Sequence, residues 1–176
     1  MGPDEFMAEA CRLAEEAVCE GLGGPFGAVI VRDGEILGRG QNRVLGTGDP
    51  TCHAEIEAIR DAAATLGEEM LVLIDRPEGS DDPVPRRARM LVGAELYTSG
   101  APCPMCLSAI YWARIDAVHF ANDWAAARAV GFDDALQYED FARPLEDRRV
   151  PLHRFRPDLG REALDAWATK PDRHPY

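Results

Sequence analysis

Two stretches, His53-Ala54-Glu55 and Pro102-Cys103-Pro104-Met105-Cys106, indicate the chemistry that this chain can carry. Each stretch follows an expected strand and loop and begins an expected helix. The Cys-x-x-Cys spacing lets a single turn present both sulfur atoms to one ion, and the partial positive charge of a helix N-terminus favours the thiolate forms. Two thiolates and one imidazole give a tetrahedral zinc ion three ligands and leave its fourth corner open, as catalysis requires. We therefore expect a zinc site formed by His53, Cys103 and Cys106.

Glu55 distinguishes a catalytic zinc site from a structural one. It lies two positions after His53, close enough to take a proton from water at the open corner, where the metal lowers the pKa of that water toward about 7. Taken alone, each feature has a plainer interpretation: Cys-x-x-Cys also occurs in structural zinc knuckles and redox pairs, His53 suits a helix start, and Glu55 suits a helix surface. The combination favours catalysis, with Glu55 as the proton shuttle.

Around these stretches, helix and strand patterns alternate along the chain. Apolar residues at three-to-four spacing predict helices over residues 3–20, 53–66, 104–113, 124–130 and 161–168. Strands are expected over residues 26–31, 35–40, 95–98 and 117–120, with Asp33-Gly34 as a hairpin turn. This alternation predicts a three-layer α/β/α arrangement, in a single domain that spans residues 1–176.

Residues 67–93 interrupt this alternation. The stretch contains several prolines, glycines and aspartates, followed by the basic cluster Arg86-Arg87-Ala88-Arg89. Because such residues favour turns over regular elements, we expect most of the stretch to form a long loop. A loop of this length is a surface insertion, a lid over the site or a contact between subunits.

The composition argues against several classes of protein. Nineteen lysines and arginines against 31 aspartates and glutamates give a net charge of −12, and such a surface repels phosphate backbones, so no nucleic-acid partner is expected. No apolar run is long enough to span a membrane, and the acidic N-terminus does not resemble a secretory signal, so we expect a cytoplasmic protein. Five cysteines suit metal binding and burial better than a disulfide framework, with Cys11, Cys19 and Cys52 expected in the core.

The combination of His-x-Glu and Pro-Cys-x-x-Cys is the known signature of zinc deaminases, and the resemblance extends over nearly the whole chain. The chain resembles the cytidine and deoxycytidylate deaminase superfamily and, within it, the small bacterial guanine deaminases. The resemblance implies a cytidine-deaminase-like fold with a central mixed sheet. The matching stretches are Gly23-Gly24-Pro25-Phe26-Gly27-Ala28-Val29-Ile30-Val31, Asn42, Asp49-Pro50-Thr51-Cys52-His53-Ala54-Glu55, Leu96-Tyr97-Thr98-Ser99, Pro102-Cys103-Pro104-Met105-Cys106, Ala109-Ile110-Tyr111-Trp112-Ala113-Arg114, Gly131-Phe132-Asp133-Asp134 and Tyr176.

In functional terms, the resemblance implies hydrolytic deamination of a free nucleobase, guanine to xanthine and ammonia, with Zn²⁺ as the cofactor. His53, Cys103 and Cys106 would bind the zinc ion, and Glu55 would move the protons. Both assignments agree with the chemistry inferred above from the residues themselves.

The resemblance also implies how the substrate is bound and how chains assemble. Asn42 and Asp134 would hydrogen-bond the purine, and Phe26 would help to wall the pocket. In the resembling family the C-terminal segment is exchanged within a homodimer, so residues 144–176 are expected to cross to a partner, with Tyr176 closing the neighbour's active site. From the residues alone, Asn42 also suits a turn, Asp134 a helix cap and Tyr176 a frayed terminus.

One departure from the family pattern bears on the substrate. The family usually has Cys-Glu directly before Pro102, where this chain has Gly100-Ala101, and the change removes a thiol and a carboxylate beside the zinc loop. Other aminated heterocycles are therefore alternatives to guanine: cytosine, isoguanine and amino-triazines such as ammeline. A tRNA adenosine deaminase is a further alternative that the acidic charge opposes. The non-enzymatic alternative is a zinc-stabilised binding module.

Overall fold

A central sheet of four strands organises the chain. The computed structural model describes residues 1–75, 78–79 and 84–176, and its larger sheet has the strand order β2-β1-β5-β6. All four strands lie where the sequence pattern predicted them, with ends that shift by no more than about two residues. They are β1 (Gly27–Arg32), β2 (Glu35–Gln41), β5 (Glu95–Gly100) and β6 (Ala117–Asn122).

The sheet is mixed, as predicted. Strand β1 runs antiparallel to both β2 and β5, whereas β5 and β6 are parallel. The turn between β1 and β2 is the predicted Asp33-Gly34, whose φ values of 54° and 79° are the positive values that a tight hairpin needs. Strands β5 and β6 are parallel because helix α4 (Pro104–Ala113) crosses over between them.

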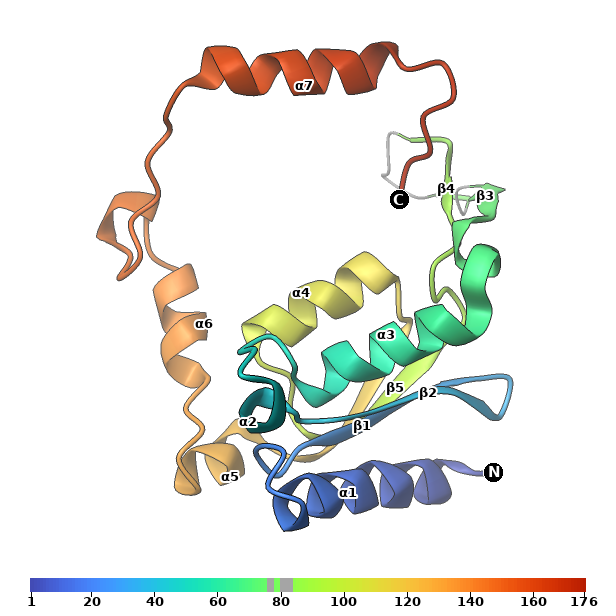
Figure 1. The fold of residues 1–176 in the computed structure, drawn as a ribbon, viewed down its shortest axis with the longest axis vertical. Coiled ribbons are helices and arrows are strands. Elements are labelled where there is room, and N and C mark those ends of the chain that lie inside the picture. The colour runs from blue at the N-terminus through green and yellow to red at the C-terminus, as the bar shows by residue number, and fades with distance from the viewer. Residues whose placement is uncertain (76–77, 80–83) are drawn as a thin grey trace.

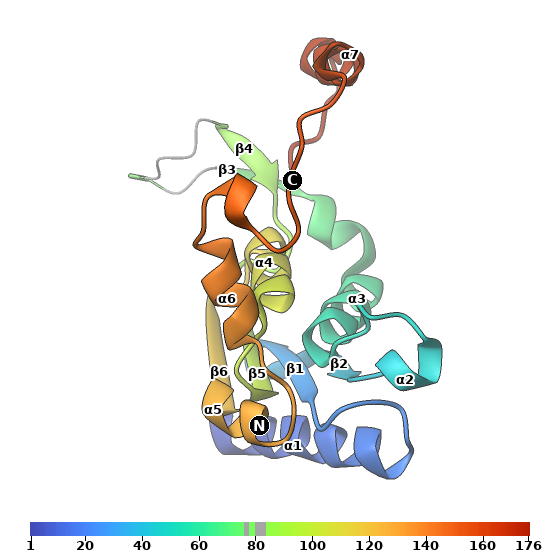
Figure 2. The ribbon, with the colours of Figure 1, turned by 90° about the vertical axis from the view of Figure 1, so that its left-hand side faces the viewer.

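Helices cover both faces of the sheet, which confirms the predicted three-layer fold. Helix α1 (Pro3–Cys19) lies on one face, and α3 (Ala54–Leu66) lies with α4 on the other, as Figures 1 and 2 show. Successive side chains of β1 point to opposite faces and so join different clusters. The cluster under α1 contains Phe6, Leu13, Val29, Val31 and Tyr97. The cluster under α3 and α4 includes Ala28, Ile30, Leu91, Leu96 and Ile110.

Helix α3 approaches the sheet closely. Its fully buried residues are Ala54, Ala58 and Ala62. These alanines lie against Gly38 and Gly40 of β2, where a Cβ atom on Gly40 would come within 2.1 Å of the Ala54 carbonyl oxygen. Small residues on both elements therefore bring the helix backbone directly onto the strand, and this contact positions the N-terminus of α3.

The stretch 67–93 contains three short regular elements that the sequence pattern did not predict. It holds a 3₁₀ helix, η1 (Gly67–Leu71), and an antiparallel pair of strands, β3 (Leu73–Asp75) and β4 (Arg86–Ala88). Residues 76–77 and 80–83 lie outside the described residues. Strands of three residues are too short to show a periodicity in the sequence, which is why the pattern did not reveal them.

The chain after β6 is helical and largely exposed. Helix α7 (Pro157–Thr169), expected over residues 161–168, begins earlier, with Pro157 in its first turn, and none of its residues is buried. Figure 1 shows α7 standing apart from the sheet and its covering helices. No helix in the described ranges is long and apolar enough to cross a membrane. The remaining helices are α2 (Val44–Thr47), α5 (Trp124–Ala129), α6 (Ala135–Phe141), η2 (Leu145–Asp147) and α7 (Pro157–Thr169).

All five cysteines are free thiols. Cys52, Cys103 and Cys106 are buried as expected, whereas Cys11 is half-buried and Cys19 is exposed. The expectation of core packing is wrong for these last two because they lie beside, and not on, the buried face of α1.

Candidate active site

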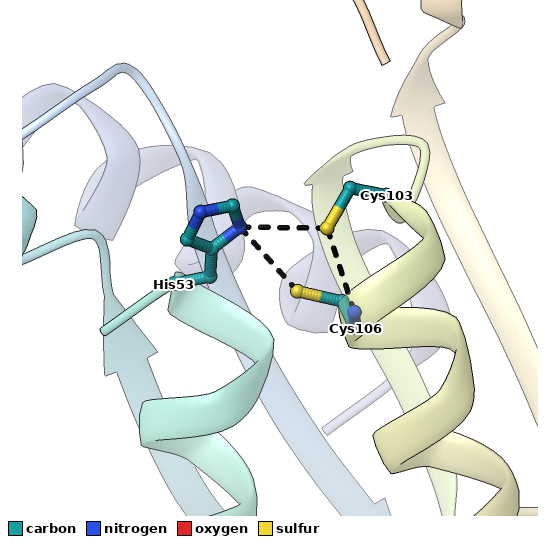
Figure 3. Close-up of side chains that lie close together, drawn as sticks. All are labelled: His53, Cys103 and Cys106. Atoms are coloured by element: carbon teal, nitrogen blue, oxygen red, sulfur yellow. Dashed lines mark hydrogen bonds between the residues drawn. The ribbon is translucent and has the colours of Figure 1, made fainter. Parts of the chain in front are cut away.

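Two helix N-termini carry the three residues predicted to bind zinc. His53 is the N-cap residue of α3 and Cys103 is the N-cap residue of α4, with Cys106 in the first turn of α4. Figure 3 shows one ring nitrogen of His53 facing both sulfur atoms. Pro104 occupies the start of α4, where its fixed φ suits a helix start and its missing N–H costs nothing.

The spacing of the three donor atoms fits one tetrahedral metal ion. Nδ1 of His53 lies 3.6 Å from Sγ of Cys103 and 3.5 Å from Sγ of Cys106. Zinc bonds of about 2.3 Å to sulfur and about 2.0 Å to nitrogen, at a tetrahedral angle, place such donors about 3.6 Å apart. The structure therefore brings the predicted donors together at coordination distance, and Glu55 is not a member of this group.

The ionisation of the two thiols also favours a bound cation. A hydrogen bond from Cys106, and secondly one from His53, lowers the pKa of Cys103 to about 4. The same pairing with Cys103, together with burial, raises the pKa of Cys106 well above its ordinary range. Two adjacent thiols resist ionising together unless positive charge is added, and a divalent cation supplies that charge. The donor set and its electrostatics therefore fit zinc.

Glu55 is a buried carboxyl group beside this cluster. It lies in the first turn of α3 and is only 5% exposed, with Oε2 3.3 Å from Sγ of Cys106. Burial raises the pKa of Glu55, and no lysine or arginine of the described ranges forms an ion pair with it. A buried carboxyl group with a raised pKa, beside the donor atoms, is suited to accept and return a proton.

Asn42 lies directly after β2 and is 4% exposed. Its Oδ1 accepts hydrogen bonds from the backbone N–H groups of Gly24, at 3.3 Å, and Val44, at 3.2 Å. Its own backbone N–H donates to the Phe26 carbonyl at 2.9 Å. The side-chain oxygen is therefore engaged by two backbone N–H groups, one before β1 and one after β2, and the amide NH₂ group is the end that remains for a ligand.

Asp134 lies close enough to the zinc-ligand cluster to interact with it electrostatically. It is the N-cap residue of α6, but its side chain makes no capping hydrogen bond, so a capping role does not account for it. Burial, and secondly the charge of Cys103, raises the pKa of Asp134, while the charge of His53 opposes this shift. Phe26 contacts the chain near Asp134 through Phe132, with ring centroids 4.9 Å apart.

Tyr176 lies away from the zinc ligands of its own chain. Its ring centroid is 6.2 Å from that of Trp112, near the C-terminal end of α4, whereas Cys103 and Cys106 lie at the N-terminal end. At a rise of about 1.5 Å per residue, the two ends of α4 are about 14 Å apart. The Tyr176 side chain is 59% exposed, and a single chain does not bring it to its own metal centre.

Two aromatic residues that the sequence analysis did not single out position the cysteine loop. The Trp124 indole N–H and the Tyr138 hydroxyl both donate to the carbonyl of Pro102, directly before Cys103, at 3.2 and 2.9 Å. Their rings also meet edge-on, with centroids 5.8 Å apart. Helices α5 and α6 thus fix the start of α4. No local pattern could reveal these contacts, because the donors lie 22 and 36 residues from the acceptor.

Comparisons with known proteins agree with this geometry. The family model for the cytidine and deoxycytidylate deaminase zinc-binding region matches residues 2–122. Guanine deaminase of Bacillus subtilis is 40% identical over 176 residues, which cover 100% of each chain. The X-ray structure of Bacillus subtilis guanine deaminase matches with a TM-score of 0.84 at 39% identity, covering 100% of this chain and 99% of that one.

A second kind of relative matches less of the chain. The tRNA-specific adenosine deaminase of Aquifex aeolicus is 35% identical over 121 residues, which cover 69% of this chain and 66% of that protein. The family model includes both zinc-binding segments. The chain therefore belongs to the cytidine and deoxycytidylate deaminase family and is a zinc-dependent aminohydrolase.

Proposed function

We propose that this chain deaminates free guanine hydrolytically, yielding xanthine and ammonia. The observation that carries the proposal is the buried carboxyl group of Glu55, 3.3 Å from a sulfur atom of the three-residue donor cluster. A zinc-stabilised binding module has no use for a carboxyl group buried at this position. The full-length similarity to a guanine deaminase supports the choice of base.

In this proposal His53, Cys103 and Cys106 hold the zinc ion. When bound, zinc supplies Lewis acidity, which lowers the pKa of water enough for a nucleophile to exist at neutral pH. Glu55 takes a proton from the attacking water and passes protons to a ring nitrogen and to the departing amine. The new C2–O bond forms, the C2–N bond breaks, and the amine leaves as ammonia.

Recognition of guanine is assigned to Asp134, Asn42 and Phe26. An ionised Asp134 offers only acceptors, whereas the ring N–H and amino group of guanine are donors. The amide NH₂ of Asn42 can donate to an acceptor atom of the purine, because its oxygen is already engaged by Gly24 and Val44. The aromatic ring of Phe26 forms one wall of the pocket.

A free base suits this chain better than tRNA. A tRNA deaminase needs a positively charged face to bind the phosphate backbone, and this chain carries a net charge of −12. We therefore propose that no nucleic acid is bound. We also place the protein in the cytoplasm, because a reducing compartment keeps the thiol ligands available for metal. Conversion of guanine to xanthine would give it a role in purine catabolism.

We further propose a homodimer in which residues 144–176 are exchanged between chains. Large apolar side chains of this segment are exposed in the single chain, as are Tyr111 and Trp112 of α4. Exposure on this scale is typical of an interaction surface. Because Tyr176 does not reach the metal centre of its own chain, delivery to the partner's site is the geometry that gives it an active-site role. The exposed residues of the segment include Leu145, Val150, Leu152, Phe155, Leu159, Leu164 and Trp167.

A panel of nucleobases assayed for ammonia release tests the function. We expect guanine to be the preferred substrate, with xanthine as the product, and no reaction with a tRNA anticodon stem-loop. The Glu55→Gln variant tests the mechanism: it should keep its zinc and lose about 10²- to 10⁴-fold in turnover. Turnover of cytosine or an amino-triazine with none of guanine would overturn the choice of base, and near-normal turnover by Glu55→Gln would overturn the mechanism.

A further inference from the structure

Phe132 joins parts of the chain that are far apart in the sequence. Its ring meets Phe26 edge-on, with centroids 4.9 Å apart and planes at 88°. This geometry is a favoured arrangement for two aromatic rings. Phe132 is nevertheless 39% exposed, so filling the core is not a sufficient reason for an aromatic residue here.

Two glycines make room for this pair of rings. A Cβ atom on Gly24 would lie 2.7 Å from Cζ of Phe132, and one on Gly100 would lie 3.1 Å from two ring carbons of Phe26. Real Cβ atoms essentially never show the first distance. Phe132 and Phe26 are therefore seated in a slot bounded by Gly24 and Gly100, which we call the glycine slot. Gly24 is itself fixed by its hydrogen bond to Oδ1 of Asn42.

Backbone contacts next to Phe132 also hold the segment that leads to Asp134. The Phe132 N–H donates to the Ala127 carbonyl at 3.0 Å, which ties the residue to α5. Gly131, with a φ of 97°, makes the turn. Asp134 follows two residues later and begins α6. The seat of the Phe132 ring and this backbone hydrogen bond therefore both hold the short segment that leads to Asp134.

We propose that Phe132, seated in the glycine slot, is a positioning residue that sets the place of Asp134 relative to Phe26 and Asn42. The inference rests on the proposed role of Asp134 in binding the base. It also gives Gly100 a purpose in this chain: without a side chain there, the Phe26 ring can lie close enough to receive Phe132. Phe132 does not touch the reacting atoms in this proposal and acts only through its neighbours.

Steady-state kinetics of the zinc-loaded, full-length protein test this role. Phe132→Ala and Gly24→Ala should each raise the KM for guanine about 10- to 100-fold, with a much smaller change in kcat, because misplacing a base-binding group weakens binding throughout the reaction. Gly100→Ala should raise KM less than Gly24→Ala does, since its Cβ atom meets ring carbons at 3.1 Å and not 2.7 Å. Gly2→Ala is the matched control, because a Cβ atom there meets nothing within 4 Å.

A double variant separates positioning from loss of fold. Phe132→Leu removes the ring atoms that a Cβ atom on Gly24 would meet, so Gly24→Ala and Phe132→Leu together should cost less than the product of their separate effects on KM. The same non-additivity should appear in Tm, which does not depend on activity. Fully additive effects in both measurements, or an unchanged KM in Phe132→Ala, overturn the positioning role alone. A wild-type protein that leaves guanine unchanged overturns the proposed function, and this inference with it.

Discussion

The backbone N–H of Ala88 donates a hydrogen bond to the carbonyl oxygen of Pro175, at 2.8 Å. The contact joins strand β4 to the last residues of the chain, and two others support it. A guanidinium N–H of Arg87 donates to the Tyr176 carbonyl oxygen at 3.3 Å, and the His174 ring contacts the Leu71 carbonyl. Figure 1 shows the C-terminus beside β4. In the single chain the insertion at residues 67–93 thus holds the chain end, and these are the contacts that the proposed exchange would transfer to the partner.

Deleting Pro175 and Tyr176 should impair guanine turnover more than it impairs stability or zinc content. The deletion removes the two hydrogen bonds that Ala88 and Arg87 donate to the chain end, but it removes little buried apolar surface because Tyr176 is largely exposed in the single chain. The proposed exchange, by contrast, gives Tyr176 a place in the partner's active site. Turnover, Tm and zinc content of the truncated and full-length proteins check this expectation. Equal turnover by the two proteins would show that Tyr176 has no such role.

Each chain should bind one zinc ion through three side chains. We expect Cys106→Ser to lower both the zinc content and Tm, because metal bound only by the folded state adds to its stability. Cys19→Ser, at an exposed position, is the matched control and should keep its zinc. Elemental analysis after dialysis gives the metal content. A Cys106→Ser protein with a full complement of zinc would rule out this ligand set.

Replacing Asp134 by asparagine should weaken guanine binding by about 1–3 kcal/mol, because donors on the base lose a charged acceptor partner. The effect is expected chiefly in KM. Asp4→Asn, in the first turn of α1, should leave KM unchanged, because α1 covers the opposite face of the sheet from α3 and α4. If Asp134→Asn hydrolyses guanine with the wild-type KM, the base is recognised by other groups.

Gly40→Ala should destabilise the protein by about 3 kcal/mol or more, as severe overpacking does. The new methyl group would lie 2.1 Å from the Ala54 carbonyl oxygen and 2.3 Å from the Ala58 nitrogen, and backbone atoms of a helix cannot move aside singly. Denaturant unfolding measures the loss. Gly160→Ala in α7, where a Cβ atom meets nothing within 4 Å, should be neutral or slightly stabilising.

Glu9 of α1 forms ion pairs with Arg12 on the same helix and with Arg39 of β2. We expect these pairs to make the free energy of unfolding depend on pH. Oε2 lies 2.8 Å from Nε of Arg12 and Oε1 lies 3.0 Å from Nε of Arg39. The hydrogen bond from Arg12, and secondly that from Arg39, lowers the pKa of Glu9 from 4.5 to about 2. A lowered carboxyl pKa adds stability above pH 4.5 that is lost as the pH falls toward about 2.

At pH 7, Glu9→Gln should therefore unfold more easily than the wild type by about 1 kcal/mol or less, the range for ion pairs near the surface. The difference between the two proteins should shrink as the pH falls from 4.5 toward 2, and also in high salt. Zinc release in acid affects both proteins alike, so the difference is the quantity to measure. Glu15→Gln, on the same helix, is the control for the change of charge, because Glu15 forms no ion pair with the described residues. A pH-independent difference for Glu9→Gln would contradict the assignment.

Local patterns were sufficient to predict the framework of this protein. The strands of the sheet, the Asp33-Gly34 turn and helices α1, α3 and α4 depend on side-chain periodicity and on turn chemistry within a few residues. The same is true of the zinc-ligand candidates, because His53 and the two cysteines each lie at a helix start that the sequence marks. Strands β3 and β4 escaped prediction because three residues carry no readable period.

The choice of side chains that bring chemistry to the site can be read from local motifs, because a metal-binding motif requires particular donor types at a short spacing. The groups that position those side chains become visible only in the folded chain. The carbonyl of Pro102 meets Trp124 and Tyr138, Phe132 enters the slot between Gly24 and Gly100, and β4 receives the chain end. These contacts join residues far apart in the sequence, and they depend on which faces of the layers pack together. Side-chain shape across an interface leaves no periodic trace in a single sequence, so the packed fold alone determines such contacts.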